Sequence, residues 1–146
     1  MENPWLNLPE KAPYILPGDC DAITKLNQKL GAKNKRASLI HDEILPEPYV
    51  GNPFTASIVL LNLNPGFKKS DRKWHRKRAF RQAALANLQH RKIKYPFYLL
   101  NPQFKHSGGA KYWKKRLGAL IKKRGKRGLY AVANAICVIE WHPYHS

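Results

Sequence analysis

The stretch Ser57-Ile-Val-Leu-Leu-Asn-Leu-Asn-Pro-Gly66 is an apolar run closed by turn residues. Such a run predicts a strand buried on both faces, which needs helices above and below it. We therefore expect an α/β fold with three α/β/α layers around a short, mainly parallel sheet. Because ligands bind beyond the carboxyl ends of such strands, Asn64-Pro65-Gly66 is the first place to expect a site. An ordinary turn is the equal alternative.

A second apolar run, Ile136-Cys-Val-Ile139, predicts another buried strand. It leads into Glu140-Trp-His-Pro-Tyr-His-Ser146, so both strands end in polar residues that would meet at one edge of a parallel sheet and form a cleft. Two strands make a poor sheet. We expect the chain to be a fragment of a longer one whose sheet is incomplete at the C-terminal end. A partner chain, or a segment assigned here as loop, could also complete it.

The size and cysteine content favour one reduced, cytoplasmic domain over residues 1–146. At 146 residues the chain is long enough for a single core. Cys20 and Cys137 are too few for a disulfide framework. No apolar run approaches the ~20 residues that a membrane helix needs, and the N-terminus lacks a secretory pattern.

The charge is both large and uneven. The chain has 27 Lys and Arg against 9 Asp and Glu, a formal net charge of +18. Residues 67–127 hold 21 of these basic side chains and a single acidic one, Asp71. Such an asymmetry indicates a polyanionic partner, and nucleic acid is favoured over a membrane surface or a merely solvated face.

Capping residues, spacing and turn residues predict the elements before the first strand. They are an irregular arm over residues 1–18, a helix from Asp19 or Asp21 to Gly31, a polar loop over 33–36, a short strand from Leu39, and a stiff loop without regular structure over 45–54. That last loop suits either a pocket wall or a rigid connector.

Two amphipathic helices are expected in the strongly basic part, residues 67–127. The first spans about residues 72–89 and the second runs from Ala110 to Gly125, with a further turn or two over 128–134. Their basic faces could follow a phosphate backbone. The candidate backbone contacts are Lys68, Lys69, Arg72, Lys73, Arg76, Lys77, Arg81, Lys114 and Lys115.

The strand ending in Leu63-Asn64-Pro65-Gly66 resembles the first active-site motif of the uracil-DNA glycosylase superfamily, in its mismatch-specific branch. The segment 142–146 loosely resembles the closing motif of that family. The resemblance implies an α/β/α sandwich that flips a base into a pocket and cleaves its glycosidic bond. Asn64 would position the attacking water, and an Asn in this place implies slow chemistry or none. A second resemblance is to uncharacterised bacterial proteins that join an Asn-Pro-Gly strand to a Pro-Tyr-His-Ser strand.

These observations together give a set of candidate residues and three candidate functions. The functions are base excision from DNA, favoured over RNA, a non-catalytic basic binding module with the same fold, and an RNA-associated protein whose Asn-Pro-Gly is only a turn. Histidine spacing fits no standard metal site, and no cofactor is expected. The candidate catalytic residues are Asn64, His142 and His145. The candidate substrate-binding residues are Asn62, Pro65, Gly66, Phe67, Tyr49, Trp74, Tyr144 and Ser146.

Overall fold

The computed structural model describes residues 2–35 and 38–146. The described residues combine short helices with three strands in one small sheet, which agrees with the α/β class predicted from the sequence. The strands are β1 (Tyr49–Val50), β2 (Ile58–Asn62) and β3 (Ile136–Glu140). The α-helices are α1 (Cys20–Ala32), α2 (Lys69–His75), α3 (Arg78–Leu88), α4 (Gly108–Arg116), α5 (Gly118–Lys123) and α6 (Gly128–Ala135). Single 3-10 turns lie at Pro4–Asn7, Pro17–Asp19, Tyr98–Leu100, Pro102–Phe104 and Gly125–Arg127.

The sheet has the strand order β1-β3-β2 and is mixed. β2 and β3 are parallel and pair from Ile58 with Ile136 to Asn62 with Glu140, so the two polar ends do lie side by side as predicted. β1 is antiparallel to β3 and pairs Tyr49 with Ile139. β1 falls inside the loop over 45–54 that was predicted to lack regular structure, so that prediction was wrong for two residues.

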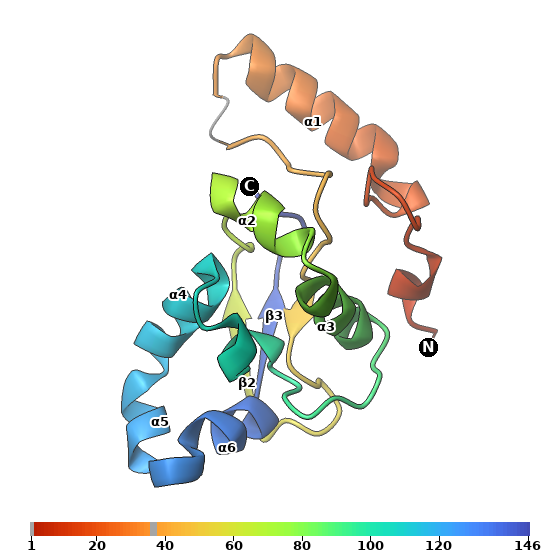
Figure 1. The fold of residues 1–146 in the computed structure, drawn as a ribbon. Coiled ribbons are helices and arrows are strands. Elements are labelled where there is room, and N and C mark those ends of the chain that lie inside the picture. Colours follow the sequence, from red (N-terminus) through yellow and green to blue (C-terminus); the bar gives the residue numbers. More distant parts are fainter. Residues whose placement is uncertain (1, 36–37) are drawn as a thin grey trace.

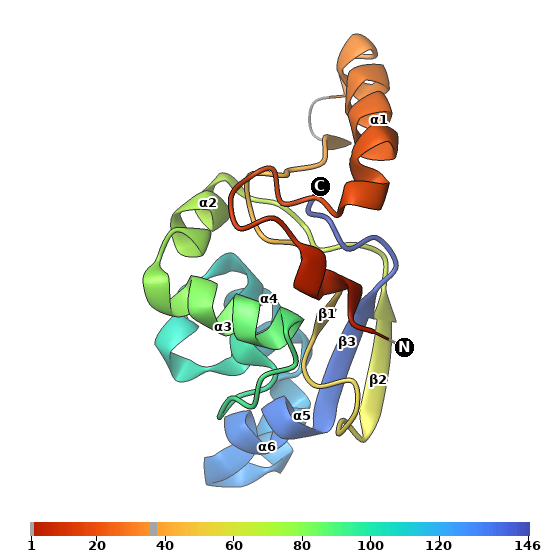
Figure 2. The same ribbon diagram turned by 90° about the vertical axis from the view of Figure 1, so that its right-hand side faces the viewer.

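The helices cover one face of this sheet. Figure 2 shows α3, α4, α5 and α6 gathered on one side of the strands. Between them and the sheet lies the main core, which contains buried residues such as Leu45, Phe97, Tyr98, Ile136 and Val138. α1 lies beyond the carboxyl ends of β2 and β3 rather than over the sheet (Figure 1 and Figure 2).

The prediction that β2 is buried on both faces was wrong. β2 is an edge strand, because it pairs with β3 alone among the described strands. Its residues are exposed or half-buried, and the side chain of Leu61 is 83% exposed. The central strand is instead β3, where four of the five residues are buried.

Both long basic helices that the sequence predicted are interrupted. The helix expected over 72–89 divides into α2 and α3 at Arg76 and Lys77, where the Lys77 backbone is extended. Lys73, Lys77 and Arg81 would stack like charges four residues apart in a continuous helix, which weakens it. The second predicted helix divides into α4 and α5 at Leu117.

The N-terminal half agrees in part with the prediction. α1 begins directly after Asp19 and ends one residue past Gly31, and Ile23 is its only buried residue. Leu39 and Ile40 form no strand, and the predicted loop at 33–36 lies partly outside the described residues. None of the described helices combines the length and apolarity required to cross a lipid bilayer.

Candidate functional site

A pocket of about 320 Å³ opens at the carboxyl ends of β2 and β3, where a parallel pair presents its polar turns. Its size is at the lower end of the range of small-molecule sites. One wall comes from the turn after β2 and from α2, and the opposite wall comes from α4. The floor comes from β3 and from the loop over residues 45–54, the Pro-rich loop. Its lining includes Glu47, Asn62, Asn64, Phe67, Asp71, His75, Ser107, Tyr112, Trp113, Glu140 and His145.

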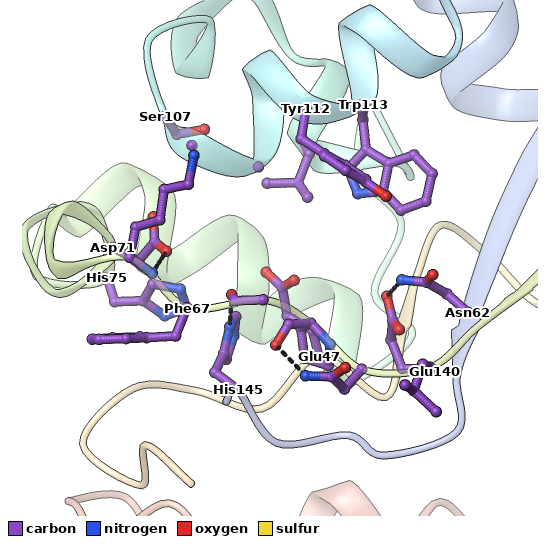
Figure 3. A pocket seen from close by; sticks show the side chains of 18 of the residues that line it. Glu47, Asn62, Phe67, Asp71, His75, Ser107, Tyr112, Trp113, Glu140 and His145 are labelled. Carbon is purple, nitrogen blue, oxygen red and sulfur yellow. Dashed lines mark hydrogen bonds between the residues drawn. The ribbon is translucent and has the colours of Figure 1, made fainter. Parts of the chain in front are cut away.

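Asn62 and Glu140 form a polar pair at the strand ends. They are register partners, and the Asn62 Nδ2 donates a hydrogen bond of 3.0 Å to Glu140 Oε1 (Figure 3). Glu140 Oε2 is buried and has no hydrogen-bond partner among the described residues. Burial raises the pKa of the Glu140 carboxyl, which nearby Glu47 raises further and the Asn62 hydrogen bond opposes. This oxygen can accept a hydrogen bond from a ligand.

Asn64 joins the two polar motifs to each other. Its Nδ2 donates to Ser146 Oγ at 2.7 Å and to the carbonyl of Pro65 at 3.3 Å. The Ser146 amide donates in turn to that same carbonyl at 3.3 Å. The structure thus brings together Asn64, Pro65 and Ser146, which the sequence singled out on separate segments. The Asn64 amide oxygen takes part in none of the hydrogen bonds found within the described residues.

The two histidines of the C-terminal segment differ in position. His142 is exposed and lies outside the pocket lining, whereas His145 is buried and lines the pocket. His145 Nδ1 donates to the carbonyl of Gly66 at 2.9 Å. Because a carbonyl only accepts, the proton of neutral His145 must sit on Nδ1, and Nε2 carries a lone pair. That Nε2 is buried without a partner in the described part of the chain.

Glu47 and His75 stand next to His145, although neither was a predicted site residue and the histidine spacing, His75 included, had indicated no metal site. One ligand atom from each of the three residues lies within 4.8 Å of the others. Tyr98 donates its hydroxyl to Glu47 Oε1 from within the core. Burial, aided by His145 and Arg81, lowers the pKa of His75 to about 3, so its imidazole is neutral. The residues come from three distant segments, so no spacing rule could find them. The only signal for Glu47 was that the loop over 45–54 suited either a pocket wall or a rigid connector, and the first of these is found.

The aromatic residues of the pocket are largely not those that the sequence proposed. Phe67 does line it, but one of its faces is stacked on His41 with ring centroids 3.4 Å apart. Tyr49 is stacked on His90, and Trp74 packs against Phe80; neither is part of the lining. Tyr112 and Trp113 from α4 lie across the pocket from Glu47 and His145 (Figure 3).

Tyr144, another proposed substrate contact, belongs to the packing of the N-terminal segment. It is buried against Ile15 and Ile23, away from the pocket lining. Its hydroxyl donates to Asp19 Oδ2 at 2.6 Å and accepts from the Leu16 amide at 3.1 Å. This side chain ties the C-terminal segment to the start of α1.

Most of the candidate phosphate contacts are exposed, and Lys68 is the one among them that lines the pocket. α2 and α4, which carry many of them, supply its two walls. Among the described residues, Arg72 is the only Lys or Arg paired with a carboxylate, that of Glu43 at 2.7 Å. Arg81 also has an internal partner, because it lies over the Tyr14 ring and donates to the carbonyl of Glu10. The exposed candidates are Lys68, Lys69, Lys73, Arg76, Lys77, Lys114 and Lys115.

Comparisons with models of protein families, with curated proteins and with solved structures found no match to this chain.

Proposed function

We propose that the chain binds nucleic acid, preferentially DNA, takes an extruded base into the pocket beside Asn64, and hydrolyses its N-glycosidic bond. One observation carries this proposal: a pocket with polar and aromatic walls lies at the parallel strand ends, between two basic helices. The resemblance of Leu63-Asn64-Pro65-Gly66 to a glycosylase motif points to the same reaction. Extruding a base costs a few kcal/mol, which stacking and hydrogen bonds in such a pocket can offset.

Recognition of the base would use both the polar and the aromatic residues of the pocket walls. The unpartnered Glu140 Oε2 accepts a hydrogen bond from a ring or amino N–H, and Asn62 holds that carboxylate in place. The aromatic rings of Tyr112 and Trp113 offer a surface on which a base can stack. The Asn64 amide oxygen, which has no partner among the described residues, accepts from the attacking water.

The phosphate backbone would lie along the exposed lysines and arginines of α2 and α4. The formal charge of +18 is almost free of internal ion pairs in the described part of the chain, so counterions must neutralise it in solution. With about six phosphate contacts, the affinity for duplex DNA should fall roughly 10³-fold between 50 and 200 mM salt. A flat salt dependence, measured by fluorescence anisotropy with a labelled duplex, would contradict the backbone assignment.

A non-catalytic binding module is the second candidate, and the tautomer of His145 favours it. An imidazole that stabilises a departing anionic base must donate a hydrogen bond. Neutral His145 uses its only N–H on Gly66 and presents a lone pair to the pocket. Its assistance to a leaving base would therefore require the imidazolium form. The exposed His142 does not line the pocket and so cannot replace it there.

Base excision can be tested directly. Duplexes with uracil, hypoxanthine or single mismatches are incubated with the protein and then treated with alkali, which breaks the strand at any abasic site. We expect cleavage that Asn64→Ala abolishes, whereas Asn134→Ala, an exposed asparagine on α6, leaves it unchanged. If all the duplexes stay intact while binding is tight and salt-sensitive, the chain is a binding module. If Asn64→Ala and wild-type cleave equally, the site assignment is wrong.

We also propose that the complete fold has the third layer that the resemblance implies. Its support is a set of exposed apolar side chains, those of Val59, Leu61, Ile139 and Trp141. The alternation of side chains along the paired strands puts them on the face opposite the buried Ile136 and Val138. Apolar side chains so grouped along two paired strands are typical of a surface that another layer covers. A C-terminal continuation or a partner chain could supply it.

A further inference from the structure

We propose that Glu47, His75 and His145 bind one divalent transition-metal ion at the inner wall of the pocket. Their ligand atoms lie within 4.8 Å of one another, although they come from the Pro-rich loop, α2 and the C-terminal segment. Atoms bound to one ion at about 2.0–2.2 Å are at most about 4.4 Å apart. Small side-chain rotations would therefore bring the three ligands to bonding distance.

The two imidazoles carry unused ligand atoms inside the protein. His75 and His145 are only 5% and 4% exposed. His75 Nδ1 and His145 Nε2 are both buried without a hydrogen-bond partner among the described residues. Buried polar atoms are rarely left unpaired, because each one loses its hydration without compensation. A metal ion would pair with both of them at once.

The neighbours of these ligands have the arrangement that metal sites use. Metal-bound histidines commonly donate their other ring N–H to a backbone carbonyl, which fixes the ring and its tautomer. His145 Nδ1 makes this bond to Gly66, so the buried Nε2 carries the lone pair that a metal ion requires. Ligating carboxylates are likewise held by hydrogen bonds, and Glu47 receives one from the hydroxyl of Tyr98.

The donor set decides which metals fit. Two imidazole nitrogens and one carboxylate suit Zn²⁺ or Fe²⁺, whereas Mg²⁺ and Ca²⁺ prefer all-oxygen ligands. Three protein ligands leave at least one coordination position open, as in sites that hold a water or substrate. Non-specific cation binding is disfavoured by a net charge of +18, so tight uptake of one ion needs a specific site.

Metal binding is measured without nucleic acid and is therefore independent of the proposed base excision. We would titrate untagged Cys20→Ser protein with Zn²⁺ by calorimetry, because Cys20 is an exposed thiol that could compete. One equivalent should bind. Co²⁺ should give the visible absorption of a low-coordinate site, and X-ray absorption should show two imidazoles and no sulfur.

Variants in the Cys20→Ser protein distinguish the proposed ligands from residues that do not bind the metal. His75→Gln, His145→Gln and Glu47→Gln should each weaken Zn²⁺ binding by more than 100-fold, while His106→Gln, an exposed histidine, should change nothing. Tyr98→Phe removes only the hydrogen bond that holds Glu47. It should weaken binding by roughly 10- to 100-fold, as losses of such orienting partners do. Equal affinities in wild-type and the three ligand variants would overturn the proposal.

A measurement on the unsubstituted histidines covers the case in which a variant fails to fold. Imidazole ¹⁵N resonances are recorded with and without one equivalent of Zn²⁺. The signals of His75 and His145 should shift together, while those of His41, His90, His106 and His142 stay in place. If no histidine pair responds, or if His142 responds instead, His75 and His145 do not bind the ion and the proposal is wrong.

Discussion

β2 and β3 are five-residue strands of similar apolar content that pair along their whole length, yet one is exposed and the other buried. The difference comes from their neighbours. β3 has β1 on its other edge, and the helices cover it from one side, while β2 has only β3 beside it among the described strands. Apolar composition therefore predicts that a segment is a strand, but pairing decides how much of it is buried.

The tightest point of this pairing is Gly51, directly after β1. Its φ is +113°, a conformation that side chains rarely adopt, and a Cβ there would lie 2.4 Å from the carbonyl oxygen of Ile136. The absence of a side chain lets the chain turn from β1 while in contact with the backbone of β3. β3 is central partly because this close approach is possible.

The largest expected effect on stability is at a pair of isoleucines that lie opposite each other on β2 and β3. Ile136 on β3 is 2% exposed and its partner Ile58 on β2 is 44% exposed. Ile136→Ala should lower the free energy of unfolding by about 2–5 kcal/mol, because it leaves a cavity in the core. Ile58→Ala should cost less than about 1 kcal/mol. Urea denaturation of both variants checks this, and equal losses would mean that β2 is as buried as β3.

Gly51→Ala should have the next largest effect, about 1–3 kcal/mol, because it adds strain at a positive φ and a clash with β3. Gly18→Ala is the matched control, since a Cβ at Gly18 meets nothing within 4 Å. Its free energy of unfolding should stay within about 0.5 kcal/mol of wild-type. If Gly51→Ala leaves the free energy of unfolding unchanged, the close approach of Gly51 to β3 does not contribute to the pairing of β1 with β3.

The sequence was a good guide wherever local signals agreed. The strand predicted at Ile136–Ile139 exists and its first three residues are buried, the polar ends of the two strands do meet, and Asn64 contacts Ser146 there. These features follow from apolar runs closed by turn residues, and from the rule that parallel strands present their carboxyl ends together.

The sequence was a poor guide wherever distant segments decide the outcome. The burial of β2 depends on what pairs with its free edge and covers its outer face, which no window of residues encodes. Glu47 and His75 reach the pocket only because the loop over 45–54 and α2, which are distant in the sequence, both line it. The break between α2 and α3 has no Pro or Gly to mark it. Distant segments decide the first two cases, whereas in the third the repulsion of like charges four residues apart outweighs the apolar spacing.

A smaller effect on stability is expected from substitution of Glu140, which pairs with Asn62 where the two strands end. Because the pKa of Glu140 is raised in the folded state, the folded protein binds more protons than the unfolded chain just above pH 4.5. Stability should therefore fall as pH rises through the folded pKa and stay reduced above it. Glu140→Gln should remove this loss and stabilise the protein at pH 7. Its control is the exposed Glu10→Gln.

The measurement is urea denaturation of wild-type and both variants across pH 4–8. If the stability of Glu140→Gln keeps the pH dependence of wild-type, the carboxylate is not desolvated in the folded protein. The hydrogen bond from Asn62 would then act on a carboxylate that water already stabilises. The ends of the two strands would be more open to water than their burial indicates.

The smallest expected effect is on the outer face of the sheet, at Leu61 on β2 and Trp141 just after β3. Both side chains are mostly exposed, so Leu61→Ser and Trp141→Ser should each change the free energy of unfolding of the monomer by no more than about 0.5 kcal/mol. Sedimentation and denaturation at several protein concentrations test this. If either variant loses more, and the loss grows with concentration, a second chain covers the face of β2. The contrast between the two strands would then describe only the isolated chain, because association would bury both.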